Sequence, residues 1–166
     1  MIDACLAALE GVLLGMGYRK VHTDLSDLAS FAGGVPSCYV YQAEPSTLTR
    51  ARRKVAFTDD PARRVRTWRH LLYEERLQLV VRLVEAGRAA LDAQKNEFLR
   101  RLPARIMDAE NNAIHVTATG CLFIEDRAAL NNKVAMEITV EFAGGVYLDR
   151  ETPLTEGIEM ETIMGG

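Results

Sequence analysis

The stretch KVAMEITVEFAGGVYLD, residues 133–149, alternates apolar and polar side chains along its first ten residues. The apolar side chains that share one side are Val134, Met136, Ile138, Val140 and Phe142. The other side holds Ala135, Glu137, Thr139 and Glu141. Successive side chains of a strand point to opposite faces, so this pattern predicts a strand with one buried face. Gly144 and Gly145 are expected to break it before a further extended piece, VYLDRE, residues 146–151.

Two other segments follow the spacing of amphipathic helices. Apolar residues recur at i, i+3, i+4 and i+7 between Ile2 and Met16, which predicts a helix that lies on a sheet. Residues 87–102 are rich in helix formers, and Pro103 is expected to end that helix. Between the first helix and the next strand, residues 18–35 are expected to connect, with a short turn around DLSDLASF, residues 24–31.

Residues 36–44, PSCYVYQAE, and residues 112–126, NAIHVTATGCLFIED, each contain a predicted strand. The segment from Thr47 to Ala86 is harder to interpret. Asp59, Asp60 and Pro61 form a turn signal of the kind that joins two strands of a hairpin. For residues 69–84 a helix is the rival interpretation, because good helix formers run throughout. The β-rich end LQLVVRLV, residues 77–84, favours a strand.

The predicted order is helix, strand, strand, helix, strand, strand. This is an α+β fold, with a mainly antiparallel four-stranded sheet, helices packed on one face and a projecting basic β-hairpin. No repeat, low-complexity region or linker divides the chain, so residues 1–166 are predicted to form a single domain.

Composition excludes several classes of protein. Hydrophobic residues make up 48% and charged residues 26% of the chain, as in an ordinary globular protein. The net charge of −3 gives no overall attraction for nucleic acid or an anionic membrane. No apolar run approaches the ~18 residues of a membrane-spanning helix. Cys5, Cys38 and Cys121 are an odd number in unpaired spacing, which favours a reduced, cytosolic chain.

The sequence contains no recognisable catalytic, metal or cofactor motif. The three histidines, His22, His70 and His115, are isolated from one another, without an H-E-x-x-H motif. If Glu74 and Glu75 lie in a strand, they point to opposite faces and share no proton or metal. No cysteine or serine has a recognisable base nearby. The chain is therefore predicted not to be an enzyme and to bind no metal or cofactor.

One segment is strongly basic. Residues 50–69 contain eight basic side chains against Asp59 and Asp60. In a hairpin, like charges on paired strands repel one another unless acidic groups neutralise them. The basic segment therefore implies a partner with an acidic surface or with phosphates. The alternative is that exposed arginines are simply solvated and protect a strand edge from aggregation. Trp68 is an interface anchor or a core residue. The interaction candidates are Arg52, Arg53, Arg64, Arg66 and Trp68.

Four stretches carry a resemblance to a known family: LQLVVRLVEAG (77–87), FLRRLP (98–103), NAIHVTATG (112–120) and NKVAMEITVEFAGGVYLDRE (132–151). With the order of elements, they resemble the tail terminator proteins of long-tailed bacteriophages and their prophage relatives. The resemblance implies a non-enzymatic virion subunit that assembles into a six-membered ring, made in the host cytoplasm and placed in the virion tail. Such a ring caps the tail tube, ends its growth, and offers a surface to head–tail joining proteins.

Competing interpretations come from other classes. A nucleic-acid-binding module would use residues 50–69 as its footprint, although aromatic residues are not interleaved with those arginines. Another neck or head–tail connector component would share the oligomeric, non-enzymatic character.

Overall fold

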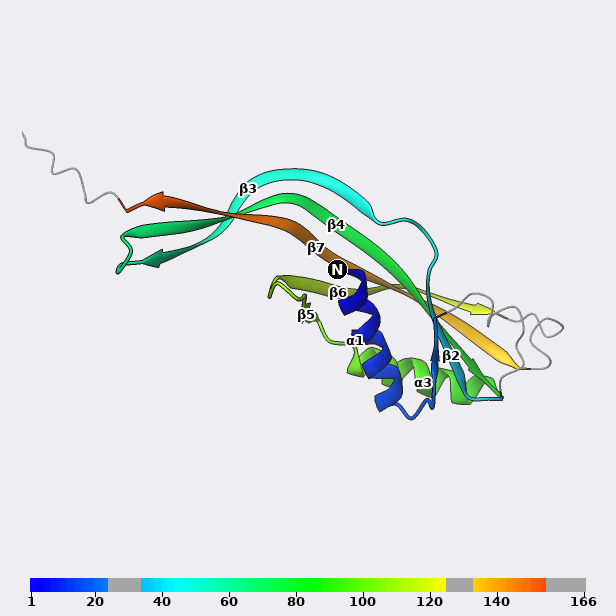
Figure 1. The fold of residues 1–166 in the computed structure, drawn as a ribbon. Coiled ribbons are helices and arrows are strands. Elements are labelled where there is room, and N and C mark those ends of the chain that lie inside the picture. The colour runs from blue at the N-terminus through cyan, green and yellow to red at the C-terminus, as the bar shows by residue number, and fades with distance from the viewer. Residues whose placement is uncertain (24–33, 125–132, 155–166) are drawn as a thin grey trace, which may run out of the picture. The chain divides into compact units, whose positions relative to one another are not determined.

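The computed structural model describes residues 1–23, 34–124 and 133–154, and the predicted turn at residues 24–31 lies outside them (Figure 1). The helices are α1 (Ile2–Gly15) and α3 (Arg88–Arg101). The strands are β1 (Val21–His22), β2 (Ser37–Gln42), β3 (Thr47–Asp60), β4 (Val65–Glu85), β5 (Arg105–Met107), β6 (Ala113–Ile124) and β7 (Val134–Pro153).

These strands form one mixed sheet. Its hydrogen-bonded order is β1-β2-β4-β7-β6-β5, and β3 pairs with β4 outside this path. The pair β1–β2 is parallel, with Val21 opposite Cys38. The pairs β2–β4, β5–β6 and β6–β7 are antiparallel. The parallel pair distinguishes this sheet from the purely antiparallel sheets that hairpins build.

The predicted four-stranded α+β fold, with order α-β-β-α-β-β, is wrong. Of the described residues, 57% lie in strands and 21% in helices, and the sheet has seven strands. Strands β1 and β5, of two and three residues, are too short to show any periodicity. The predicted break at Gly144 and Gly145 is also wrong, because β7 continues through both glycines. For residues 69–84, the strand is confirmed and the helix is not.

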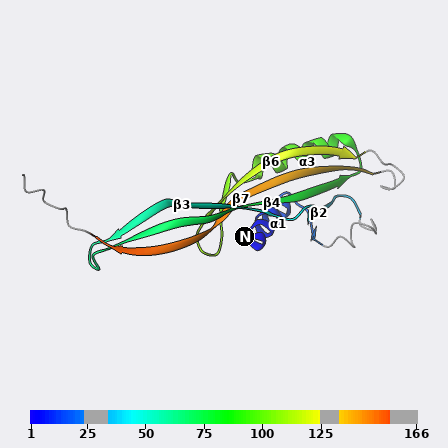
Figure 2. The same ribbon diagram turned by 90° about the horizontal axis from the view of Figure 1, so that it is seen from above.

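The chain divides into two compact units. The larger unit comprises Met1–Thr49 and Glu74–Gly145, and the smaller unit comprises Arg50–Tyr73 and Val146–Gly166. Strands β3, β4 and β7 have residues in both units. Within the larger unit, β4, β7 and β6 run side by side (Figure 2).

The core of the larger unit lies between its two helices and one face of its strands. Helix α1 contributes Cys5, Leu9 and Leu13, and α3 contributes Leu91 and Phe98. The sheet contributes an inward-facing set from four strands: Cys38, Val40, Leu77, Leu79, Val81, Leu83, Ile114, Val116, Met136, Ile138, Val140 and Phe142. The predicted alternation from residue 136 to 142 is therefore confirmed. Removal of this apolar surface from water is the main force that holds the larger unit together.

The opposite face of the larger unit is not wholly polar. Ala135, predicted on the polar side, is buried in a second small cluster with Tyr39 and Val84. Beside it, the Glu137 carboxylate accepts hydrogen bonds from the Tyr41 hydroxyl at 2.5 Å and from Arg82 Nε at 2.9 Å. Burial opposes ionisation of Glu137, but the hydrogen bonds from Tyr41 and Arg82 lower its pKa overall. Burial, together with the bond to Glu137, raises the pKa of Tyr41 to about 12.

The three thiols should differ sharply in reactivity. Cys5 and Cys38 are buried and Cys121 is exposed. Burial raises the pKa of both buried thiols to about 12, which suppresses the reactive thiolate. We expect a thiol reagent near pH 8 to modify Cys121 at least ~100-fold faster than either buried cysteine. Quantification of the released chromophore, with Cys121→Ser as the control, checks this. Rapid reaction of the Cys121→Ser variant would contradict the packing of α1 against β2.

Candidate interaction surface

The smaller unit is a three-stranded sheet built on a hairpin. Residues 50–60 of β3 and 65–73 of β4 are joined by the turn at residues 61–64. The predicted turn signal is confirmed, because Asp60 Oδ1 accepts a hydrogen bond from the Arg63 backbone and Arg64 N bonds to Pro61 O. Residues 146–153 of β7 pair with β4, and Leu154 N donates to Arg64 O.

Three arginines of the hairpin are paired with acids of the same chain. Arg63 forms a two-pronged ion pair with Glu151 of β7, with N–O distances of 2.9 and 3.0 Å. Arg69 does the same with Asp149, at 2.9 Å for both contacts. On the hairpin itself, Arg66 holds Asp59 at 2.6 and 2.8 Å. The chain therefore supplies its own acidic groups for these three arginines, and no separate partner is needed to neutralise them.

Trp68 belongs to a surface cluster of aromatic rings and cations. Its ring centroid lies 5.2 Å from that of Phe57 on the neighbouring strand. Lys54 Nζ lies 4.2 Å from the Trp68 ring centroid, and the Arg66 guanidinium lies 4.4 Å from that of Phe57. Phe57 is 55% exposed, and Trp68 is only partly buried. Trp68 is thus not a core residue, and the cluster presents an apolar, cationic surface.

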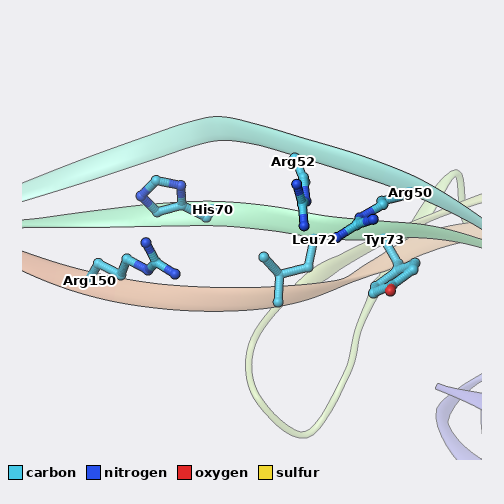
Figure 3. Close-up of a pocket in the computed structure, with 6 residues that line it drawn as sticks. All are labelled: Arg50, Arg52, His70, Leu72, Tyr73 and Arg150. Carbon is cyan, nitrogen blue, oxygen red and sulfur yellow. The ribbon is translucent and has the colours of Figure 1, made fainter.

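The same three-stranded sheet also carries a pocket of about 430 Å³, which we call the cationic pocket. It is lined by Arg50, Arg52, His70, Leu72, Tyr73 and Arg150. Figure 3 shows that its arginines come from the two outer strands, β3 and β7, while the other lining residues come from β4 between them. Arg52 adopts a left-handed backbone conformation with φ of 50°, which interrupts the regular alternation of β3. Within the described residues, none of the three arginines forms an ion pair.

The structure places the five sequence candidates in different settings within the smaller unit. Arg52 lines the cationic pocket, Arg66 is committed to Asp59 and Phe57, and Trp68 lies in the aromatic cluster. Arg53 is exposed on β3, and Arg64 lies in the turn with φ of 55°.

Sequence reasoning missed Arg150 as a partner of Arg50 and Arg52, and missed the acids on either side of it. The available signal was the alternation of charge in LDRE, residues 148–151. That pattern does not reveal which strand lies next to β7, because β4 is about 80 residues away along the chain.

Both outer edges of this three-stranded sheet lack a strand neighbour in the described part of the chain. Strand β3 pairs only with β4. The contact between β6 and β7 ends at the pair His115 and Ala143, so residues 146–153 have β4 alone as a neighbour. Exposed apolar side chains accompany these edges, namely Val55 and Phe57 on β3 and Val146 and Leu148 on β7.

No family model matches the chain, and no curated protein is significantly similar to it. Among residues 1–23, 34–124 and 133–154, no group of three or more histidine, cysteine or carboxylate side chains is placed to hold a metal ion. No helix in the same ranges is long and apolar enough to cross a membrane.

Proposed function

We propose that this chain is a non-enzymatic structural subunit of a bacteriophage or prophage tail. In this proposal, copies of the chain form a ring, six-membered as the family resemblance implies, that caps the tail tube, ends its polymerisation and provides a surface for head joining. The observation that carries the proposal is the smaller unit's sheet, which has two edges without a strand neighbour among the described residues, each flanked by exposed apolar side chains.

An unpaired edge exposes a row of backbone donors and acceptors, and proteins that stay monomeric normally cover or shorten such edges. Strand β3 has 14 residues, and residues 146–153 of β7 form the other edge, so both edges are longer than the very short edge strands that proteins use to avoid association. The two edges are also different from each other. A closed ring requires two different, complementary patches on each copy, so one β3 edge and one β7 edge per subunit meet this requirement.

The strand directions are consistent with such a ring. Strand β4 runs antiparallel to β3 in the hairpin, and antiparallel to β7, as the contacts Arg69–Asp149 and Leu154–Arg64 show. The β3 and β7 edges therefore run in the same direction. Rotation about a ring axis preserves strand direction along that axis, so the β7 edge of one copy would meet the β3 edge of the next in parallel.

The test is tail assembly with and without this chain. Tail tube subunits of the same phage or prophage should polymerise to tubes of uniform length, each ending in a ring, when the chain is present. They should form tubes of variable length when it is absent. The variant Val146→Lys/Leu148→Lys should lose the ring, while Leu122→Lys, at an exposed site in the larger unit, should retain it. Tube lengths in electron micrographs that do not depend on the chain would overturn the proposal.

One observation favours a second candidate function, the nucleic-acid-binding module. Lys54 lies over the ring of Trp68 and Arg66 over that of Phe57, so the fold brings aromatic rings next to basic groups that the sequence does not interleave. Such surfaces bind single strands by stacking and charge. This alternative requires an affinity for DNA or RNA that falls steeply with salt concentration.

A further inference from the structure

The cationic pocket is electrostatically incomplete within the described residues. Three guanidinium groups line one concave site, and none has the carboxylate of a described residue within ion-pair distance. Like charges that share a site repel one another, and the repulsion is strongest where water is partly excluded. Elsewhere in the same unit, Arg63, Arg66 and Arg69 each hold an acid of their own chain. The pocket is therefore suited to bind an anion.

The charge of the described part of the smaller unit supports this assignment. Residues 50–73 and 146–154 carry nine lysines and arginines against four aspartates and glutamates, a net charge of +5, whereas the whole chain has −3. The remainder of every copy is thus acidic. A second copy of the chain therefore offers acidic groups to the basic residues of the first, and it is always present in equal amount.

We infer that the cationic pocket binds glutamate carboxylates from the C-terminal segment, residues 155–166, of a second copy of this chain. The inference rests on the proposed ring and names the contact that links neighbouring copies. A pocket and a terminal segment are two different patches, and this is the kind of contact that closes a ring.

The composition of the C-terminal segment matches the pocket. Glu156, Glu159 and Glu161 fall within six residues without a lysine or arginine, and no other six-residue stretch of the chain has three acids and no base. The segment therefore has as many carboxylates as the pocket has guanidinium groups, and each guanidinium can bind a carboxylate through two hydrogen bonds. Ile158 and Met160 supply apolar groups for Leu72 and Tyr73 of the pocket.

The phosphates of a nucleic acid carry the same sign of charge as the glutamate carboxylates, but the net charge of the chain disfavours binding of a nucleic acid. At −3, the protein as a whole repels a polyanion at long range, whereas a short segment of another copy meets only the local field of the basic unit. Binding of nucleic acid is therefore the competing result of the experiment.

The experiment compares four full-length chains by sedimentation velocity over a range of concentration. They are the wild type, the pocket variant R50Q/R52Q/R150Q, the tail variant E156Q/E159Q/E161Q and a control, R19Q/R100Q/R105Q, which loses the same charge at exposed sites of the larger unit. We expect the pocket and tail variants to associate at least tenfold more weakly than the wild type, and the control to associate as the wild type does. Circular dichroism verifies folding, and the tail variant leaves every described residue unchanged.

Mixing the two variants gives the sharpest readout. The tail variant keeps an intact pocket and the pocket variant keeps an intact tail, so the mixture should associate at least tenfold more strongly than either variant alone. A mixture that behaves as its separate components would overturn the inference, because the pocket would then not bind a tail from another copy. A short single-stranded DNA, tested by fluorescence anisotropy, provides the other arm. If the pocket variant loses DNA binding while the tail variant retains wild-type association, the pocket is a nucleic-acid site and the inference fails.

The inference and the proposed function fail differently. A wild type that forms rings, with a tail variant that forms them equally well, refutes the pocket–tail contact and leaves the ring intact. A wild type that stays monomeric at every concentration refutes the ring itself.

Discussion

Replacement of Phe142 by alanine is expected to lower the free energy of unfolding by about 3–5 kcal/mol. Phe142, on β7, is fully buried in the main core cluster and lies opposite Val116 of β6. The loss combines the transfer free energy of the ring with the cost of the cavity that remains, because the surrounding helices and strands relax only partly. Urea denaturation at fixed protein concentration, followed by far-ultraviolet circular dichroism, measures it.

The matched control is Leu122→Ala on the adjacent strand β6. Leu122 is 60% exposed, so its truncation removes little buried surface and should change stability by less than about 0.5 kcal/mol. An equal loss in the free energy of unfolding for the two variants would contradict the burial of Phe142 in the core of the larger unit.

The second large effect should come from Glu137→Ala. This change leaves the Arg82 guanidinium and the Tyr41 hydroxyl without their shared acceptor in a half-buried setting. The cost of such unpaired groups is about 1–3 kcal/mol, limited here by the water that still reaches them. The matched control on the same strand is Glu141→Ala. Its partner Arg76 is 60% exposed, so the expected loss is below about 1 kcal/mol.

Glu137 also predicts a pH dependence. Its pKa in the folded protein is lower than its ordinary value of 4.5, so its ionised form contributes stability above that value. This contribution disappears as the pH falls through the lowered pKa of the folded state. The free energy of unfolding should therefore decline less steeply below about pH 4.5 in Glu137→Ala than in the wild type. Parallel declines for the two proteins would contradict the stabilisation of the carboxylate by Tyr41 and Arg82.

Features that depend on local pattern could be predicted from the sequence. The alternation after Val134, the first helix, and the turn at Asp60 and Pro61 all arise from side-chain periodicity or turn chemistry within a few residues. The β-branched residues near the end of segment 69–84 favour a strand there, and the structure confirms it. These signals are local because strand pleat, helix period and turn conformation are set by neighbouring residues.

Features that depend on distant pairing could not be predicted. Strands β1 and β5 exist because their backbones complete the edges of a sheet built by other segments, and two or three residues carry no pattern of their own. The bend expected at Gly144 and Gly145 is overridden because β4 and β6 pair along β7 up to the glycines and β4 pairs beyond them. The acids that form ion pairs with Arg63 and Arg69 lie on β7, and the sequence does not reveal that β7 is next to the hairpin.

The same reason explains what was missed at the candidate site. The sequence predicts the same role for Arg52 and Arg66 as members of one basic segment. In the structure Arg66 is neutralised by Asp59, while Arg52 is not neutralised within the described residues. Only the register of β3, β4 and β7 separates paired arginines from unpaired ones. Arg150, on β7, completes the cationic pocket for that reason.

The central claim is that this protein acts by presenting surfaces to copies of itself. The mass of the particle that the chain forms in solution tests this claim most directly. Sedimentation equilibrium, with imaging of the same sample by electron microscopy, should show a closed ring of six copies of 18.4 kDa, about 110 kDa in total. A particle of 18.4 kDa at every concentration, with no ring in the images, would contradict it.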